Sequence, residues 1–97
     1  IQVGHVLAFK TFMATLPLAD FRAHPVKPTV MSESWYEHHP DRLAEDGAWI
    51  GDRDVRFASY VPLLQGCVGG TYGAHGLWSF YDGAEADWGL NERPGLW

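Results

Sequence analysis

Short strand-like segments alternate with longer helical segments along this chain, and this order leaves few possible folds. We expect strands at residues 1–5, 29–32 and 68–78, with helices over residues 6–16 and 52–65 between them. Parallel strands need crossover connections, usually helices, so the order predicts right-handed βαβ units and a parallel sheet of the α/β class. Helices that cover only the outside of three such strands leave the other face bare. We therefore expect a piece of a larger barrel.

The first helical segment carries apolar residues at helical spacing. Phe9, Phe12, Met13 and Leu16 recur at i, i+3, i+4 and i+7, which predicts one buried helix face. Pro17 follows them. Because proline lacks a backbone N–H, we expect the regular pattern to stop there and a second helical turn or two to follow over residues 18–24.

The second helical segment is predicted to begin at Gly51 or Asp52 and to end near Gly66. Its expected buried face consists of Phe57, Tyr60, Val61 and Leu64. Pro62 lies inside the segment. A proline there removes a donor and crowds the preceding turn, so we expect a kink or a helix in two parts.

The composition suits one small domain spanning residues 1–97, because 46% of the residues are hydrophobic and 14% are aromatic. A formal net charge of −5 without a basic cluster argues against nucleic acid or an anionic membrane as the main partner. No apolar run reaches the ~20 residues of a membrane span. The single cysteine, Cys67, excludes an internal disulfide and is expected to be a small buried hydrophobe. The chain starts without Met and stops just after a turn-like Arg93-Pro94-Gly95, so we expect a fragment of a longer protein.

Residues 27–37 carry the clearest chemical signal. A short apolar run follows a proline-containing entry, and polar and aromatic residues come next, as at the end of a buried parallel strand. Glu33 would then lie at the carboxyl end of a strand, the edge where α/β proteins bind ligands. A carboxylate beside Trp35 and Tyr36 indicates a carbohydrate ligand, because aromatic rings pack on sugar faces while a carboxylate meets hydroxyls or the anomeric carbon.

Other candidate ligand-binding residues lie near the remaining strand ends. Gln2 and His5 stand at the exit of the first strand. The glycine-rich stretch 68–78 permits close approach of a ligand or of another backbone. Its polar-tipped aromatic residues are Tyr72, His75 and Trp78. The loop 38–51 is long and charged, as loops that line sites often are.

Adjacent histidines with a nearby carboxylate raise the alternative of a transition-metal site at His38, His39 and Asp41. Adjacent side chains usually diverge, and no fourth ligand has a convincing spacing, so we predict no metal site. The other charges of this region are expected to form a solvated surface with weak ion pairs. They are Arg42, Glu45, Asp46, Arg53 and Arg56.

Several groups of residues follow one another in the order and spacing of a known family. They are Gln2-Val3-Gly4-His5, Pro25-Val26-Lys27-Pro28-Thr29-Val30-Met31-Ser32-Glu33-Ser34-Trp35-Tyr36-Glu37, Asp54-Val55-Arg56 with Tyr60 and Gly66, Gly70-Thr71-Tyr72-Gly73-Ala74-His75-Gly76-Leu77-Trp78, and Pro94-Gly95. Over nearly the whole chain the pattern closely resembles the apiosidase-like glycoside hydrolases, which are glycoside hydrolase family 140 and its wider group of (β/α)8-barrel hydrolases. Two positions depart from it. The family more often has Gly-Glu-Pro at residues 32–34, and an ordinary helix former at Pro62.

The resemblance implies a fragment of a (β/α)8 TIM barrel, approximately strands 6 to 8 with the intervening helices. It also implies a retaining glycoside hydrolase that acts on complex polysaccharide, with Glu33 as nucleophile and the acid/base aspartate upstream of this chain. The expected substrate-binding residues are Gln2, His5, Trp35, Tyr36, Tyr72, His75 and Trp78. Such glycosidases need no cofactor, and family members are typically bacterial and secreted or periplasmic.

The partner of this segment would be the remaining strands of the parent barrel, and the isolated chain is expected to be inactive. Two other functions stay open. A non-catalytic carbohydrate-binding barrel would keep the aromatic residues and lack the partner acid. A metal-dependent hydrolase would use His38 and His39.

Overall fold

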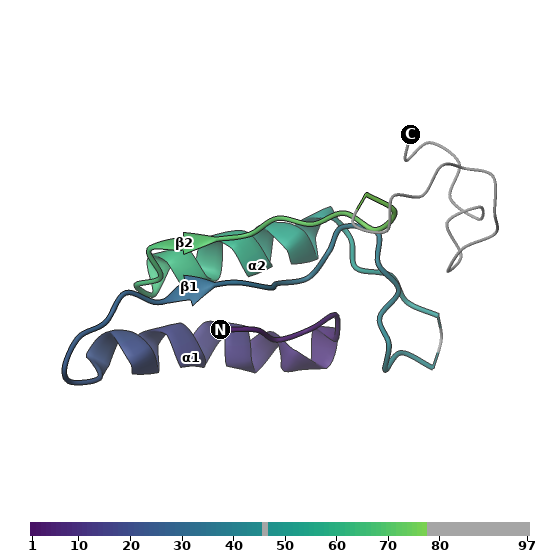
Figure 1. The fold of residues 1–97 in the computed structure, drawn as a ribbon. Coiled ribbons are helices and arrows are strands. Elements are labelled where there is room, and N and C mark those ends of the chain that lie inside the picture. Colours follow the sequence, from purple (N-terminus) through teal and green to yellow (C-terminus); the bar gives the residue numbers. More distant parts are fainter. Residues whose placement is uncertain (46, 78–97) are drawn as a thin grey trace.

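The computed structural model describes residues 1–45 and 47–77, so the predicted ligand residue Trp78 and the turn at 93–95 lie outside the described residues. The elements follow in the order η1 (Leu7–Phe9), α1 (Lys10–Arg22), β1 (Val30–Met31), α2 (Asp52–Leu64) and β2 (Gly69–Gly70). Strands and helices alternate along the chain, as the sequence predicts (Figure 1).

The strands form a small parallel arrangement with β1 in the middle. β1 pairs with β2 in parallel, Val30 opposite Gly69 and Met31 opposite Gly70. On its other side the N-terminal segment joins through a parallel bridge between Gln2 and Glu33, and the N-terminal ammonium donates to the Val30 carbonyl at 2.7 Å. Segments that follow one another in the sequence therefore lie next to one another in space. Regular strand pairing is shorter than predicted, because only a few residues on each segment take part.

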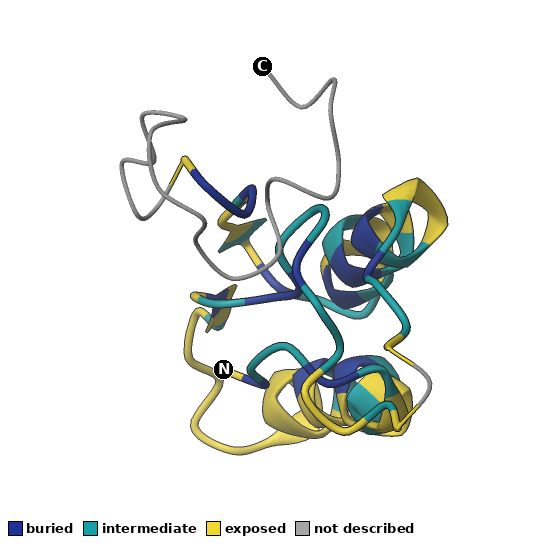
Figure 2. Ribbon diagram, turned by 90° about the vertical axis from the view of Figure 1, so that its right-hand side faces the viewer, coloured by how far each residue is buried: buried dark blue, intermediate teal, exposed yellow. Residues whose placement is uncertain are grey.

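Both helices cover the same side of the strands (Figure 2). The core between them consists of Val3, Met13, Met31, Trp35, Ile50, Val55, Ala58 and Cys67. The prediction that Cys67 is a buried hydrophobe is confirmed. In residues 1–45 and 47–77, no helix has the length and apolar character to cross a membrane.

The predictions that the regular pattern stops at Pro17 and that Phe12 and Leu16 are buried are wrong, whereas the helical turns expected after Pro17 are present as part of the same helix. The helix continues to Arg22, and Phe12 and Leu16 are 50% and 40% exposed. The buried residues of α1 are Met13 and Pro17. They are four residues apart and so share one face, and burial of the proline ring against the core offsets the missing backbone hydrogen bond.

The second helix is where the sequence predicts it, but its buried face is different. α2 begins after Gly51, whose N–H donates to the Asp54 carboxylate at 3.1 Å. It runs as one helix through Pro62, so the alternative of a helix in two parts is wrong, and the kink stays a prediction. The buried residues are Val55, Ala58 and Pro62, whereas Tyr60 and Leu64 are exposed. The small side chain of Ala58 permits close packing against the strands, which turns the bulkier residues outward.

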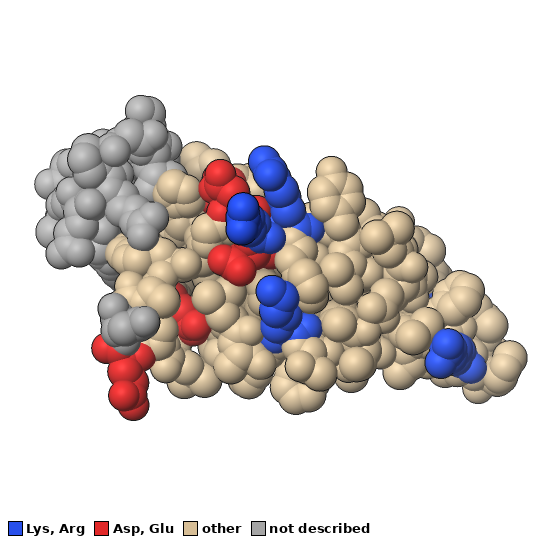
Figure 3. Space-filling model, turned by 180° about the vertical axis from the view of Figure 1, so that it is seen from behind, with Lys and Arg blue, Asp and Glu red and all other residues tan. Residues whose placement is uncertain are grey.

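Figure 3 shows the opposite face of the molecule, where basic and acidic side chains lie near one another with uncharged surface around them. No broad patch of a single charge dominates this face in the described part of the chain. The absence of a nucleic-acid partner stays a prediction.

Candidate active site

Glu33 lies at the carboxyl end of β1, where it continues the parallel pairing with the N-terminal segment. The Val3 N–H donates to the Glu33 carbonyl at 3.2 Å. Gly4 follows with a φ of +63°, a conformation that favours glycine, and turns the chain so that His5 faces Glu33. Two neighbouring segments thus bring their side chains to one point, as the strand order requires.

Two side chains hold the Glu33 carboxylate. The Gln2 amide donates from Nε2 to Oε2, and the His5 Nε2 lies 3.3 Å from Oε1. The Tyr36 backbone N–H donates to the other ring nitrogen of His5, Nδ1, at 3.4 Å. Since Nδ1 accepts, the proton of a neutral His5 is on Nε2 and points at Glu33.

The protonation of His5 decides the nature of this contact. Burial, with the nearby Arg42 and His75, lowers the pKa of His5 from 6.5 to about 4. His5 is therefore neutral at pH 7, and the contact to Glu33 is a hydrogen bond rather than an ion pair. A neutral donor orients the carboxylate without cancelling its charge, which suits a nucleophile.

A cleft of about 420 Å³ opens in front of this carboxylate. Its lining residues are Val3, Gly4, His5, Val6, Phe9, Glu33, Tyr36, His39 and Arg42. Arg42 was predicted to be a surface charge, and its contribution to the cleft was missed. The sequence feature that could have predicted this contribution is the position of Arg42 in the loop 38–51, which is expected to line a site. The loop reaches the cleft because the Arg42 N–H donates to the His5 carbonyl at 3.4 Å.

Three histidine rings form a column behind the carboxylate. The His5 and His39 ring centroids lie 4.2 Å apart, and those of His39 and His75 lie 4.6 Å apart. His39 and His75 are buried, and burial lowers the pKa of His39 to about 4. The His39 Nδ1 lies 2.7 Å from the Pro40 carbonyl, which fixes the proton on that nitrogen. Among the described residues, its Nε2 has no hydrogen-bond partner.

The other predicted ligand residues take different places. Trp35 is 0% exposed and donates from Nε1 to the Val6 carbonyl at 3.1 Å, so the structure shows it packing in the core. Tyr36 lines the cleft and contacts the His5 ring, with centroids 4.2 Å apart. His75 lies behind His39, outside the cleft lining. The role of each in binding stays a prediction.

Tyr72 belongs to a separate group of side chains. Its hydroxyl donates to Glu37 Oε2, and that hydrogen bond, with partial burial and the negative charge, raises the pKa of Tyr72 to about 12. Glu37 is held in turn by a parallel bridge to Ala74. Gly73 lies between Tyr72 and Ala74 in the sequence. Its backbone passes so close to the Tyr36 ring that a Cβ on residue 73 would overlap the ring.

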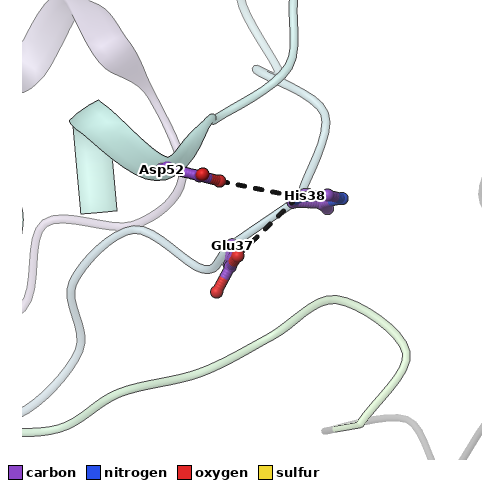
Figure 4. A group of neighbouring side chains, drawn as sticks. All are labelled: Glu37, His38 and Asp52. Carbon is purple, nitrogen blue, oxygen red and sulfur yellow. Dashed lines mark ion pairs between the residues drawn. The ribbon is translucent and has the colours of Figure 1, made fainter. Parts of the chain in front are cut away.

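The residues of the alternative metal site do not converge. His39 faces His5 and His75, while the Asp41 carboxylate accepts the N–H groups of Leu7 at 3.3 Å and Leu43 at 3.1 Å. His38 points the other way, toward the side chains of Glu37 and Asp52 (Figure 4). Its Nε2 lies 3.7 Å from Glu37 Oε1 and 3.8 Å from Asp52 Oδ1.

Comparison with known proteins agrees with the motifs. No curated protein and no solved structure matches the chain. The family described as apiosidase-like, catalytic domain, matches residues 1–94. That match covers nearly the whole chain and indicates a glycosidase parent. The predicted resemblance is confirmed at this level, and the chain belongs to the apiosidase-like catalytic-domain family.

Proposed function

We propose that this chain is part of a retaining glycoside hydrolase in which Glu33 is the nucleophile. The observation that carries the proposal is the Glu33 carboxylate itself, which two donors fix at the wall of a cleft of about 420 Å³. A cleft of this size accommodates a sugar ring. The neutral His5 donor leaves the negative charge available for attack on the anomeric carbon.

The reaction needs a second carboxyl group about 5–5.5 Å from the first, to protonate the leaving oxygen and later to activate water. The described residues do not supply it in this cleft. Glu37 is bonded to Tyr72, and the Asp41 carboxylate accepts backbone N–H groups. We therefore place the acid/base residue in a part of the parent protein outside this chain.

The parallel strand order supports a position within a (β/α)8 barrel. Three parallel segments in sequential order, with both helices on one side, are what strands 6 to 8 of such a barrel would contribute. A whole barrel typically takes about 250 residues, so the isolated chain would lack most of the cleft and would be inactive. Complex polysaccharide is the substrate class that we propose from the family.

The test compares two carboxylate variants in the parent protein. Glu33→Gln keeps the shape and removes the charge, so turnover of a polysaccharide or aryl glycoside should fall by several orders of magnitude with an unchanged circular dichroism spectrum. Glu45→Gln alters an exposed carboxylate and should leave turnover unchanged. In Glu33→Ala, added azide should restore part of the turnover by taking the place of the nucleophile. Near-normal turnover in Glu33→Gln would overturn the assignment.

The rival is a non-catalytic carbohydrate-binding barrel. It would bind a glycan without hydrolysis, with an affinity that Glu33→Gln leaves unchanged. Titration calorimetry with the same glycan separates the two functions.

A further inference from the structure

We propose that Glu37, His38 and Asp52 bind a divalent transition-metal ion such as Zn²⁺ (Figure 4). The three side chains offer two carboxylate oxygens and one imidazole nitrogen, and these donor atoms all lie within 4.8 Å of one another. Two carboxylates balance the charge of a divalent ion. A mixed set of oxygen and nitrogen donors suits Zn²⁺ or Mn²⁺ better than Mg²⁺, which prefers oxygen alone.

The distances suit an ion better than direct hydrogen bonds. His38 Nε2 lies 3.7 Å from Glu37 Oε1 and 3.8 Å from Asp52 Oδ1, both beyond hydrogen-bond length. Around a tetrahedral Zn²⁺ with bonds of about 2.0–2.2 Å, neighbouring ligand atoms would be roughly 3.3–3.6 Å apart. His38 Nε2 needs to approach each carboxylate by only a few tenths of an ångström. The three donor atoms lie within 4.8 Å of one another, so Glu37 and Asp52 would also move toward each other around the ion. Water would take the fourth position.

Each ligand is positioned by a contact of its own. Tyr72 donates to Glu37 Oε2 and leaves Oε1 turned toward His38. His38 has a φ of 59°, and its N–H donates to the Ile50 carbonyl at 2.9 Å. Asp52 is the first residue of α2. Contacts that orient metal ligands in this way are usual around protein metal sites.

The position of the His38 ring also suits a metal ligand. Its Nε2 faces one oxygen of each carboxylate at ion-pair distance, beyond the length of a hydrogen bond. An imidazole nitrogen that faces two carboxylate oxygens forms with them a mixed donor set for a cation. The positive end of the α2 dipole opposes a cation at Asp52, and the two carboxylate charges offset it.

The site would act as a clamp outside the reaction itself. It would join the segment after β1 to the start of α2, across the loop 38–51. His39, the next residue after His38, lines the cleft of Glu33 and packs on His5. A bound ion would therefore hold this wall of the cleft in place. The inference does not depend on the role of Glu33.

The experiment is titration calorimetry of the parent protein with ZnCl₂ after removal of metal by EDTA. We expect one equivalent of Zn²⁺ to bind, with Mg²⁺ binding far more weakly. His38→Ala removes a ligand and should lower the affinity by more than about 100-fold, whereas Tyr72→Phe removes an orienting contact and should lower it by about 10-fold. The matched control is His24→Ala, which removes an exposed histidine far from the site in sequence and should leave the affinity unchanged.

Three results would overturn the proposal: no saturable binding of Zn²⁺, an unchanged affinity in His38→Ala, or an equal loss in His24→Ala. The last would mean that surface histidines bind the ion without a built site. Circular dichroism checks that each variant folds. If His38→Ala does not fold, Asp52→Asn decides, because Asp52 is 69% exposed and its replacement leaves the packing intact.

Discussion

Glu33 and Glu37 leave the same strand four residues apart, yet their surroundings differ in almost every respect. Glu33 lies in the cleft and is held by Gln2 and a neutral His5. Glu37 is not among the residues that line the cleft. It lies between the Tyr72 hydroxyl and the imidazole ring of His38. The first is oriented by two donors at the cleft, which suits the nucleophile role proposed for it. The second is joined to groups that also suit a cation. The type of residue does not decide the role here, and its neighbours do.

The largest effect should separate the two carboxylates directly. In the parent protein, Glu33→Gln should lower kcat by at least about 10³-fold, and Glu37→Gln by less than about 10-fold, because only Glu33 faces the cleft. Steady-state kinetics on one glycoside measures both. Equal losses in the two variants would remove the distinction between the sites.

The histidines give the next largest difference. His5→Ala removes a donor to the Glu33 carboxylate and should lower kcat by about 10²-fold, with KM changed little. His5→Gln, which can still donate, should recover part of that loss. His38→Ala should change kcat by less than about 3-fold without added metal. A loss of kcat in His38→Ala as large as in His5→Ala would mean that both groups serve one site.

The pKa of the buried histidines predicts how stability depends on pH. In the folded chain His5 and His39 have pKa values of about 4, below the unfolded value of 6.5. The unfolded state therefore takes up protons first as the pH falls, and stability decreases from pH 6.5 toward pH 4. Each histidine should contribute a loss of roughly 2 kcal/mol between pH 7.5 and 5.

Urea unfolding of the parent protein at pH 7.5 and 5 measures this loss of stability. His39→Asn should reduce the dependence on pH, and the exposed His24→Ala should not. A stability that stays constant between the two pH values would contradict the low pKa values of the histidine column.

The smallest effect concerns Tyr72. Its hydrogen bond to Glu37 raises its pKa to about 12, so its phenol should ionise at a higher pH than that of an ordinary tyrosine. Replacement of Glu37 by Gln should lower the pKa of Tyr72 toward 10. Ultraviolet absorbance measured against pH follows the ionisation of the tyrosines in Glu37→Gln. The same titration of Tyr72→Phe serves as the reference from which the contribution of Tyr72 is obtained. An unchanged midpoint would show that the two side chains do not bond in solution.

The sequence predicts the strand order and the place of Glu33 because both depend on local patterns. A short apolar run behind proline and a carboxylate after it are visible within residues 27–37. The alternation of strands and helices then fixes which segments are neighbours. Gln2 and His5 follow from the same reasoning, since adjacent parallel strands end at one edge.

The helix faces could not be predicted in the same way. Two apolar stripes overlap in α1, one through Phe12 and Leu16 and one through Met13 and Pro17. Periodicity alone does not choose between them, because the choice depends on what α1 packs against. Two other placements depend on the path of the loop 38–51, which residue spacing in the sequence does not encode. One is Arg42 in the lining of the cleft. The other is the group formed by Glu37, His38 and Asp52.

Gly73 has a consequence for how this protein can change. Because any Cβ at residue 73 would overlap the Tyr36 ring, even alanine must push aside a wall of the cleft. In a library randomised at residue 73, selection for hydrolysis should return glycine alone, although residue 73 is not among the residues that line the cleft. A backbone position can thus be as intolerant of mutation as a nucleophile, for a purely steric reason.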